Sequence, residues 1–475
     1  MPLLISMAMT LAGTDIDWGA KLKRDADRFR AVVLDSHPGP VDPENPSFRV
    51  VLEQAHARAL ERARTASSHA HYSWALWELT SAFDDGHLGI MTPDAPGPRA
   101  YRWTGFTTRL ADGRHVVAYS DEPGIAVGAT VTACDGRDTD ALAADRIGRF
   151  HGRWSLRSNR ERSSGTLFLP SNNPWNAPLA RCTFEIAGAR RDVALRWRPI
   201  DADRAGELID VASKAQMRHR TSVGLERLPD GSFWVNMGSF EGDPRTEQGR
   251  ALTALNAEIS ARADEIRRAP RVVFDLRGNN GGSSSWINQA AGAIWGEGTL
   301  RGRVHVSTGI DWRVSDGNAA ALASYKKLFE SKRETDPALY KGIVTIADGL
   351  ADARARGLQL WREPENAFPE PEGRPVHAVT AKAFVFTDED CASACLDAVD
   401  VLTALGATQV GRETSADTLY MEVCNETTPD GARIWVPMKV YRGRPRGSNV
   451  PATPKYEWTG ALGDTAGIRR WIAAL

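Results

Sequence analysis

Ser393 stands in a sequence context in which its hydroxyl could act as a nucleophile. An apolar run at residues 384–386 and an acidic turn precede it, and an amphipathic helical pattern over residues 394–402 follows. At such a strand-to-helix turn the hydroxyl is exposed, and the first N–H groups of the helix are free and partly positive. These conditions favour nucleophilic attack with an oxyanion stabilised nearby. Serine is also a common helix N-cap, so this segment alone leaves both interpretations open.

A glycine-rich turn follows a second apolar run. Residues 271–276 predict a buried strand, and Gly278, Gly281 and Gly282 lie in the turn after it. Glycines permit positive φ and close approach of the backbone to a ligand, and adjacent N–H groups in such a turn can bind an anion. The Gly-Lys-Ser/Thr ending of a phosphate loop and the G-x-G-x-x-G spacing of a dinucleotide turn are both missing. The turn is therefore a candidate anion-binding turn of another kind.

A histidine, His87, follows a third segment that predicts a helix. Trp74, Trp77 and Phe83 lie on that helix, and Gly86 is a suitable stop signal. A histidine in a glycine-flanked loop is free to point into a cleft and act as a base. By itself, however, a lone histidine in a loop is more often an ordinary surface residue.

Together these segments resemble the serine peptidase superfamily of C-terminal processing proteases, the tricorn core and interphotoreceptor-retinoid-binding-protein-like proteins. The most specific match is Asp-Leu-Arg-Gly-Asn-x-Gly-Gly at residues 275–282. Ser-Ala-Cys at residues 393–395 matches the Ser-Ala-Ser nucleophile turn, and Asp-Gly-His at residues 85–87 matches the histidine motif of the tricorn-like branch. The resemblance runs from about residue 15 to the C-terminal tail, with an unfamiliar stretch near residues 305–380.

The sequence departs from the processing proteases at one residue. Those enzymes use a Ser–Lys dyad whose lysine lies in a Gly-x-x-Thr-x-Gly-Lys turn. The matching turn here runs from Gly411 to Asp417, with Asp417 in the place of the lysine and no lysine before Lys439. The resemblance to the tricorn-like branch therefore implies that His87 is the base.

This resemblance assigns roles to individual residues. His87 would take the proton of Ser393 during attack on a carbonyl and then pass it to the leaving group. The N–H of Ala394 and those of Gly281 or Gly282 would form the oxyanion hole.

A carboxylate is also expected to orient the imidazole of His87. Tricorn has a glutamate near its C-terminus in a supporting role, but residues 446–449 contain no acid at the comparable place. Asp417 and Glu413 are candidates by position, and Asp84 and Asp85 by adjacency. We prefer Asp417. For each of these acids, an ordinary solvated loop carboxylate is the competing interpretation.

Composition excludes several classes of function. The 475 residues suffice for two or three domains with a sizeable core. A net charge of −1 gives no electrostatic argument for binding nucleic acid or an anionic membrane. No pattern indicates a metal site or a cofactor. The expected partner is a peptide or protein substrate, and assembly into a homo-oligomer stays open.

The five cysteines, Cys134, Cys182, Cys391, Cys395 and Cys424, are too few for a disulfide scaffold. Cys391 and Cys395 lack the spacing and the nearby histidines of a metal site. We interpret them as small side chains that pack the nucleophile turn. A bridge from either of them to Cys424 stays open if the protein is exported.

The N-terminal segment, residues 1–12, is apolar but lacks the basic start of a signal peptide. It is compatible with a remnant of such a signal. Bacterial relatives are commonly exported, so the resemblance implies a periplasmic or secreted protein. No other segment is long and apolar enough to span a membrane.

Three parts are expected along the chain. Residues 15–92 predict an N-terminal helical region that carries the histidine, and residues 98–200 predict a β-rich module. Within the module, residues 128–136 resemble part of a PDZ domain, which would bind a peptide by adding a strand; a bridging module without a ligand is the alternative. Residues 220–475 alternate apolar strands with helices and predict an α/β core with a largely parallel sheet.

A polar helical insertion at about residues 305–380 would cap this core or serve as a dimerisation arm. The crotonase/ClpP-like topology of the core is implied by the resemblance alone.

The sequence thus predicts a serine hydrolase, most simply a peptidase. Two alternatives stay open: a catalytically idle protein that binds an apolar ligand or a peptide on the same scaffold, and an esterase or amidase for a small molecule.

Overall fold

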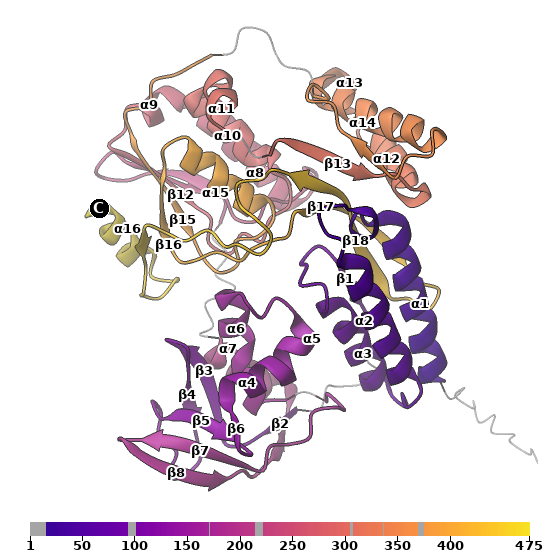
Figure 1. Ribbon diagram of the computed structural model, residues 1–475. Coiled ribbons are helices and arrows are strands. Elements are labelled where there is room, and N and C mark those ends of the chain that lie inside the picture. Colours follow the sequence, from indigo (N-terminus) through magenta and orange to yellow (C-terminus); the bar gives the residue numbers. More distant parts are fainter. Residues whose placement is uncertain are drawn as a thin grey trace, which may run out of the picture.

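The computed structural model describes residues 16–93, 101–170, 172–213, 222–304, 307–335, 337–368 and 375–475. They form a mixed α/β protein in which a helical bundle, a β-rich module and an α/β core lie side by side (Figure 1). This confirms the expected fold class at its coarse level. The apolar segment interpreted as a signal remnant lies outside the described residues.

The N-terminal part is a bundle of helices: α1 (Trp18–Ser36), α2 (Phe48–Ala63) and α3 (His69–Ser81), with the 3₁₀ turn η1 (Gly39–Val41) between the first two. Asp17 and Ser68 cap α1 and α3 by accepting backbone N–H groups of the first turn. Phe29, Leu52 and Tyr72 are fully buried between the helices. The bundle is therefore a firm support for the loop after α3, which carries His87.

The β-rich module is built on an antiparallel sheet with strand order β3-β4-β5-β7-β8. Its strands are β3 (Phe106–Ala111), β4 (Arg114–Ser120), β5 (Thr130–Cys134), β6 (Arg137–Asp138), β7 (Arg181–Ile186) and β8 (Ala189–Ala194), with a separate pair β2 (Tyr101–Trp103) and β9 (Arg198–Ile200). Its helices are α4 (Thr139–Ala143), the π-helix η2 (Ala144–Gly148), α5 (Arg149–His151), α6 (Arg157–Ser163), the 3₁₀ helix η3 (Ser164–Phe168) and α7 (Ala202–Ala212). A Cys134–Cys182 disulfide joins β5 to β7.

The α/β core has a sheet of order β10-β11-β12-β15-β16-β19. Its strands are β10 (Gly224–Arg227), β11 (Phe233–Asn236), β12 (Arg271–Asp275), β15 (Lys382–Thr387), β16 (Thr408–Gly411) and β19 (Tyr456–Glu457). All neighbours are parallel except the edge pair β10–β11. The largely parallel sheet expected from the apolar runs is thus present.

Helices cover both faces of this sheet, as a buried parallel sheet requires. They are α8 (Glu247–Ala261), α9 (Ala263–Arg267), α10 (Ser285–Trp295), α11 (Glu297–Arg303), α15 (Ala394–Ala404) and α16 (Thr465–Ala473). Val272 and Phe274 face a core shared with α8, α10 and α15, whereas Val273 faces a smaller core with α16. Alternate residues of one strand therefore serve the two faces.

A further sheet, which we call the linking sheet, was not expected from the sequence. Its strands run β1-β18-β13-β14, with β17 also paired to β18. They are β1 (Gly89–Met91), β13 (Gly309–Arg313), β14 (Leu360–Arg362), β17 (Tyr420–Thr427) and β18 (Arg433–Arg442). The insertion was expected to be helical. Its helices α12 (Asp316–Leu328), α13 (Lys332–Thr335) and α14 (Pro337–Ala355) are present, but it also contains two short strands: β13 pairs with β18, and β14 pairs with β13.

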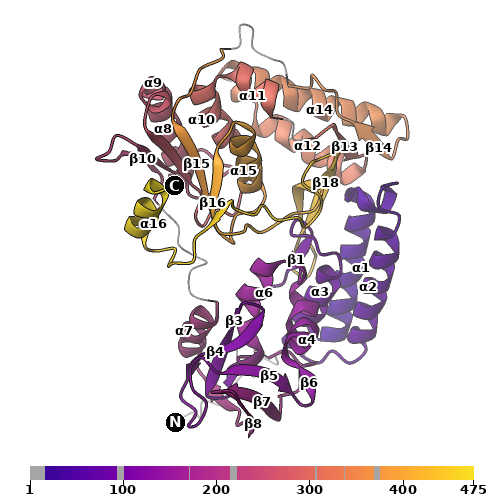
Figure 2. The same cartoon turned by 60° about the vertical axis from the view of Figure 1, so that its left-hand side comes forward.

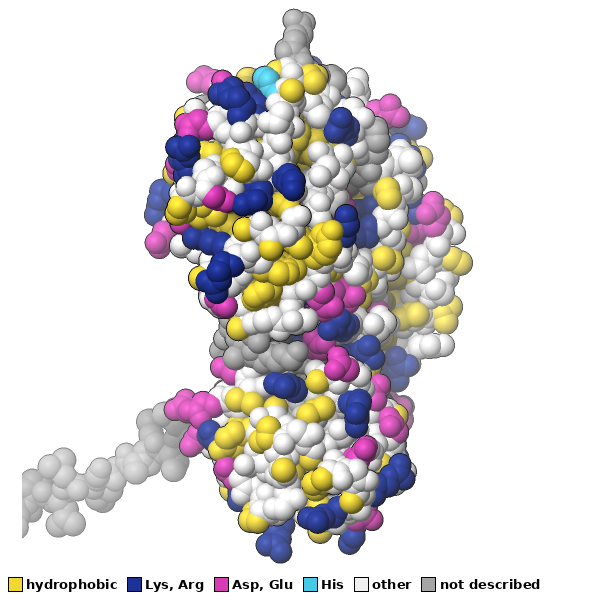
Figure 3. All heavy atoms as spheres, turned by 90° about the vertical axis from the view of Figure 1, so that its left-hand side faces the viewer, with side chains coloured by type: hydrophobic (Ala, Val, Ile, Leu, Met, Phe, Trp, Pro, Cys, Tyr) yellow, Lys and Arg dark blue, Asp and Glu magenta, His cyan; other side chains and the backbone are white. Residues whose placement is uncertain are grey.

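The linking sheet joins the N-terminal bundle, the insertion and the C-terminal half of the chain (Figure 2). The N-terminal region (residues 15–92) and the α/β core (residues 220–475) therefore share a sheet, and the division of the chain into these parts stays a proposal. On the face drawn in Figure 3, basic and acidic side chains are interspersed, in keeping with a net charge of −1.

Candidate active site

The nucleophile turn, residues 388–393, connects β15 to α15. Ser393 occupies the N-cap position of α15, but its side chain caps no backbone N–H of the helix. Its backbone has φ 54° and ψ −126°, a left-handed conformation that is unfavourable for a residue other than glycine. A strained serine between a strand and a helix presents its hydroxyl outward, as a nucleophile must. The strand, turn and helix expected around Ser393 are present.

His87 and Ser393 lie together although 306 positions separate them in the sequence. The Nε2 atom of His87 is 3.2 Å from the Oγ of Ser393, so the hydroxyl can donate to an unprotonated Nε2. The Nδ1 atom is buried, and within the described residues no group forms a hydrogen bond with it. The pair has the contact that a serine and its general base require.

Asp85 holds the backbone of the His87 loop, residues 84–88. Its Oδ1 accepts the N–H of His87 at 2.8 Å, and its Oδ2 accepts the hydroxyl of Thr418 at 3.0 Å. The Nε2 of His37 lies 3.9 Å from the same Oδ2. Burial favours the neutral carboxyl, but His37 and His87 outweigh it and lower the pKa of Asp85. A charged, buried carboxylate thus fixes the loop that carries His87.

Asp417 binds the nucleophile's backbone and makes no described contact with the imidazole. Its Oδ2 accepts the N–H of Ser393 at 2.5 Å, and the residue is 3% exposed. The sequence predicted that Asp417 orients the imidazole of His87. The structure instead places Asp417 against the backbone N–H of Ser393. The carboxylate of Asp417 thus gives the N–H of Ser393 the hydrogen-bond acceptor that a buried donor needs.

The other two candidate acids also have other surroundings. Asp84 accepts the backbone N–H of Arg153 at 2.5 Å through its Oδ1. Burial raises the pKa of Glu413, whose charged neighbours include Arg157 and Glu161 rather than His87. Of the four acids considered, only Asp85 contacts His87.

The glycine turn, residues 277–282, packs directly against the nucleophile. A Cβ added to Gly281 would lie 2.6 Å from the Cβ of Ser393, so only glycine fits there. The N–H of Gly281 already donates to the Oδ1 of Asn279 at 2.9 Å. Within the described part of the chain, the N–H groups of Gly282 and Ala394 donate to nothing. Gly282 and Ala394, rather than Gly281, therefore carry free N–H donors in these two adjoining turns.

Two buried groups fix the glycine turn. Arg277 and Asp275 are both fully buried and form an ion pair in which Nε donates to Oδ1 at 2.9 Å. The Oδ2 of Asp388, in the nucleophile turn, accepts the N–H of Gly278 at 2.8 Å. Burial and the nearby Asp390 and Glu389 raise the pKa of Asp388. The two turns are thereby tied to one another.

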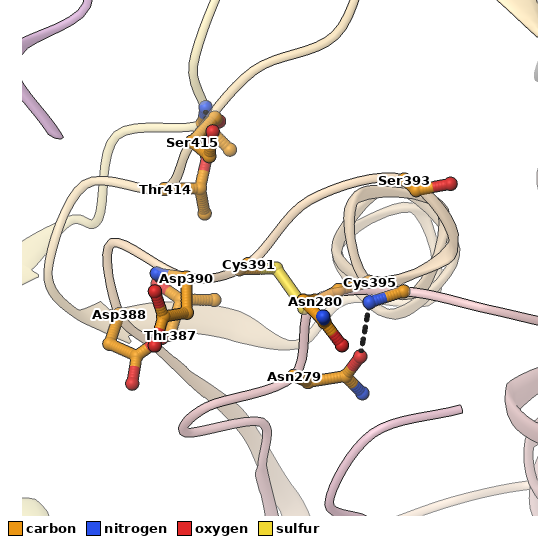
Figure 4. Close-up of a disulfide and its surroundings, with 12 residues drawn as sticks. Asn279, Asn280, Thr387, Asp388, Asp390, Cys391, Ser393, Cys395, Thr414 and Ser415 are labelled. Carbon is orange, nitrogen blue, oxygen red and sulfur yellow. Dashed lines mark hydrogen bonds between the residues drawn. A yellow bond between two sulfur atoms is a disulfide. The ribbon is translucent and has the colours of Figure 1, made fainter. Parts of the chain in front are cut away.

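The cysteines differ from the expectation. Cys391 and Cys395 form a disulfide with each other, and Cys424 is free. The interpretation of Cys391 and Cys395 as unbridged packing side chains is therefore wrong, and the bridge to Cys424 that the sequence left open does not form because the two cysteines are bonded to each other. Figure 4 shows the bond on the inner side of the turn, with the side chain of Ser393 directed away from it.

Among the described residues, no cluster of histidines, cysteines and acids could hold a metal ion. No described helix is long and apolar enough to cross a membrane.

Solved structures with the same fold define the class of protein. Mature CPAF is 14% identical over 96% of both chains with a TM-score of 0.58. Its complex with lactacystin is 14% identical over 96% of this chain and 97% of that chain, with a TM-score of 0.56. The photosystem II D1 C-terminal processing protease matches at 12% identity over 93% of both chains, but with a TM-score of only 0.33. No protein-family model and no curated protein matches the chain.

The chain therefore has the fold of mature CPAF, over nearly the whole length of both. The resemblance drawn from the sequence agrees with this likeness at the level of the fold. At this identity the likeness concerns the fold, and the site rests on its own geometry.

Several contributors to the site were missed from the sequence. His37, Thr418 and Arg153 come from three distant segments and contact the His87 loop, the Asp417 segment or both. No local pattern marks them, because their role arises only where the bundle, the module and the core meet. Asp388 lay within the acidic turn, but nothing in the sequence separated it from its neighbours.

Proposed function

We propose that the protein is a serine peptidase in which Ser393 is the nucleophile and His87 is the general base. The observation that carries this proposal is the 3.2 Å contact between Nε2 and Oγ. The fold shared with mature CPAF supports it at the level of the scaffold.

In the proposed reaction, Ser393 attacks the carbonyl carbon of the scissile bond while His87 accepts the hydroxyl proton at Nε2. The imidazolium then donates that proton to the leaving amine, and a water molecule repeats the sequence to release the acid. The N–H groups of Ala394 and Gly282 are proposed to stabilise the oxyanion, because both are free, Ala394 follows Ser393 in the chain and Gly282 follows the glycine that packs on Ser393.

We propose that two carboxylates, Asp85 and Asp417, each position one member of the His87–Ser393 pair. Asp85 positions His87 through the backbone N–H, and its negative charge favours the imidazolium that forms during attack. Asp417 positions Ser393 through its N–H. Both act as positioning residues.

A polar pocket beside the glycine turn is the proposed place for the substrate. Its lining residues come from the segment after β11, the start of α8 and the glycine turn. They are Gly238, Ser239, Phe240, Glu241, Gly242, Gln248, Asn280, Gly281 and Gly282. All but one of these residues are glycines or polar residues, and such a lining suits an extended peptide better than an apolar ligand. This observation favours a peptide over an apolar ligand and over a small-molecule ester or amide. The contact between Nε2 of His87 and Oγ of Ser393 is what favours a peptidase over an idle peptide-binding protein.

Finer parts of the expectation stay proposals. They are the crotonase/ClpP-like topology of the core, a PDZ-like ligand site in the β-rich module and a homo-oligomer. We also propose export to the periplasm or the medium, because the two disulfides suit an oxidising compartment.

Digestion of an unfolded protein such as casein tests the proposal. Wild type is expected to produce new peptides that mass spectrometry detects, and Ser393→Ala and His87→Ala are expected to produce none. Hydrolysis of small esters without any peptide cleavage would support the esterase alternative instead. Absence of both reactions in folded, oxidised wild type would support the idle binding protein.

A further inference from the structure

The Cys391–Cys395 disulfide encloses the nucleophile. The bridged loop is Cys391-Ala392-Ser393-Ala394-Cys395, so it contains both Ser393 and the proposed oxyanion donor Ala394. Both cysteines are fully buried. A small shift of the backbone in this bridged loop would therefore displace the hydroxyl of Ser393 and the N–H of Ala394 together.

The backbone at Ser393 needs external restraint. A left-handed φ, such as the 54° of Ser393, is unfavourable at a residue other than glycine and persists only where the surroundings impose it. A relaxed alternative is available, because a serine at a helix start ordinarily adopts a β-region backbone and caps the helix with its hydroxyl. In that conformation Oγ would bind the N–H groups of α15 and would no longer face His87.

Noncovalent contacts hold the acidic part of the turn, where Asp388 binds Gly278, Glu389 pairs with Arg412 and Asp390 pairs with Arg162. Fewer contacts act on the backbone near Ser393 itself. The N–H of Ser393 binds Asp417, and the N–H of Cys391 donates to the carbonyl of Asp388 at 3.2 Å. Gly281 packs against Ser393 from one side only. The disulfide is the covalent restraint that ties the residue before the turn's apex to the first turn of α15.

We propose that the Cys391–Cys395 disulfide is a positioning element of the nucleophile, so that oxidised protein is active and reduced protein is not. The proposal rests on the function proposed above. Reduction by a dithiol breaks the S–S bond, each sulfur gains an electron and a proton, and the dithiol becomes a cyclic disulfide. Ser393 then relaxes to the capping conformation.

The test compares two double variants of the full chain. Cys391→Ala/Cys395→Ala removes the proposed positioning element, and Cys134→Ala/Cys182→Ala removes the disulfide of the β-rich module as a matched control. The first readout is the second-order rate of labelling by a fluorophosphonate probe. We expect a loss of about tenfold to a hundredfold for the first variant and little change for the control. Dithiothreitol should slow labelling of wild type and of the control, and reoxidation should restore it.

A second readout does not depend on catalysis. Hydrogen exchange of peptides spanning residues 388–397 should quicken in the first variant and in reduced wild type, with exchange elsewhere unchanged. Unchanged exchange in this segment would overturn the proposal, as would undiminished labelling of the first variant. If oxidised wild type never labels, the proposed function fails, and the exchange data still decide whether the disulfide orders the turn.

Discussion

At the scale of single residues, the site depends on two backbone N–H groups being held by buried carboxylates. Asp85 holds the N–H of His87, and Asp417 holds the N–H of Ser393. Each carboxylate thus places one member of the pair without touching its reacting atom. This differs from a triad in which one acid binds the imidazole directly.

Substitutions of Asp417 separate these two arrangements. Asp417→Asn keeps an oxygen that can accept the N–H of Ser393, whereas Asp417→Ala leaves a buried donor unpaired at a cost of about 1–3 kcal/mol. We expect kcat for peptide hydrolysis to fall much further in Asp417→Ala than in Asp417→Asn. Equal losses would instead indicate that the charge of Asp417 acts on His87, as the sequence predicted.

Gly281→Ala tests the close approach of the glycine turn. The new Cβ would lie 2.6 Å from the Cβ of Ser393 on a backbone with φ 99°. Displacing the nucleophile by about 1 Å is expected to lower kcat about a hundredfold. Gly113→Ala is the matched control, because Gly113 also has positive φ (72°) but no neighbour within 4 Å. Similar activity losses in both variants would contradict the proposed contact.

The sequence predicted the residues at this scale better than their connections. Ser393 and His87 were identifiable because their motifs are local and specific. The partner of each carboxylate was not: Asp85 lies two positions from His87 and Asp417 lies 24 positions from Ser393, and neither separation shows which polar group the side chain meets. Only the fold decides which N–H each one meets, and the same holds for Gly281, whose N–H is taken by Asn279.

At the scale of elements, the end of α1 supports the His87 loop through a buried histidine. His37 stacks on Phe48 of α2 with ring centroids 4.4 Å apart, and its Nδ1 accepts the N–H of Gly39 at 2.8 Å. Its Nε2 therefore carries the proton and faces Asp85. Burial lowers the pKa of His37, although Asp85 acts in the opposite direction.

This arrangement predicts a pH dependence of stability. The folded pKa of His37 lies below the unfolded value of 6.5, so its contribution is complete above pH 6.5 and diminishes as the pH falls below it. His37→Asn should remove up to about 1.4 kcal/mol per pH unit from the fall in unfolding free energy between pH 6.5 and 5.5. Urea denaturation at several pH values measures this. An unchanged slope in the variant would show that His37 titrates alike in both states.

The linking sheet shows the limit of sequence reasoning about elements. The strands of the α/β core were predictable because buried parallel strands are continuous apolar runs. β1, β13 and β14 have three to five residues and meet partners far along the chain. Such short strands carry no usable alternation, and only tertiary pairing makes them strands.

At the scale of the whole molecule, Arg153 connects the β-rich module to both halves of the site. Its N–H donates to Asp84 at 2.5 Å and its Nη1 donates to the carbonyl of Ala416 at 2.9 Å. A Cβ on Gly86 would lie 2.8 Å from that Nη1. The module, drawn below the core in Figures 1 and 2, therefore touches the loops that carry His87 and Asp417.

Arg153→Ala should lower peptide hydrolysis about tenfold, because it removes the guanidinium that binds Ala416 and lies against Gly86, while the backbone N–H bound to Asp84 is retained. Arg149→Ala is a suitable control: Arg149 also reaches the bundle, where its Nε donates to Glu78 at 2.6 Å, but it contacts neither loop. The measurement is kcat/KM together with the melting temperature. Equal losses in the two variants would mean that the module merely supports the fold.

The central claim is that His87 activates Ser393, and one labelling experiment tests it most directly. Oxidised wild type, Ser393→Ala and His87→Ala are treated with a fluorophosphonate probe, and the modified peptide is identified by mass spectrometry. We expect the adduct on Ser393 in wild type and none in either variant. Labelling of Ser393 that persists in His87→Ala would contradict the claim and require a different base.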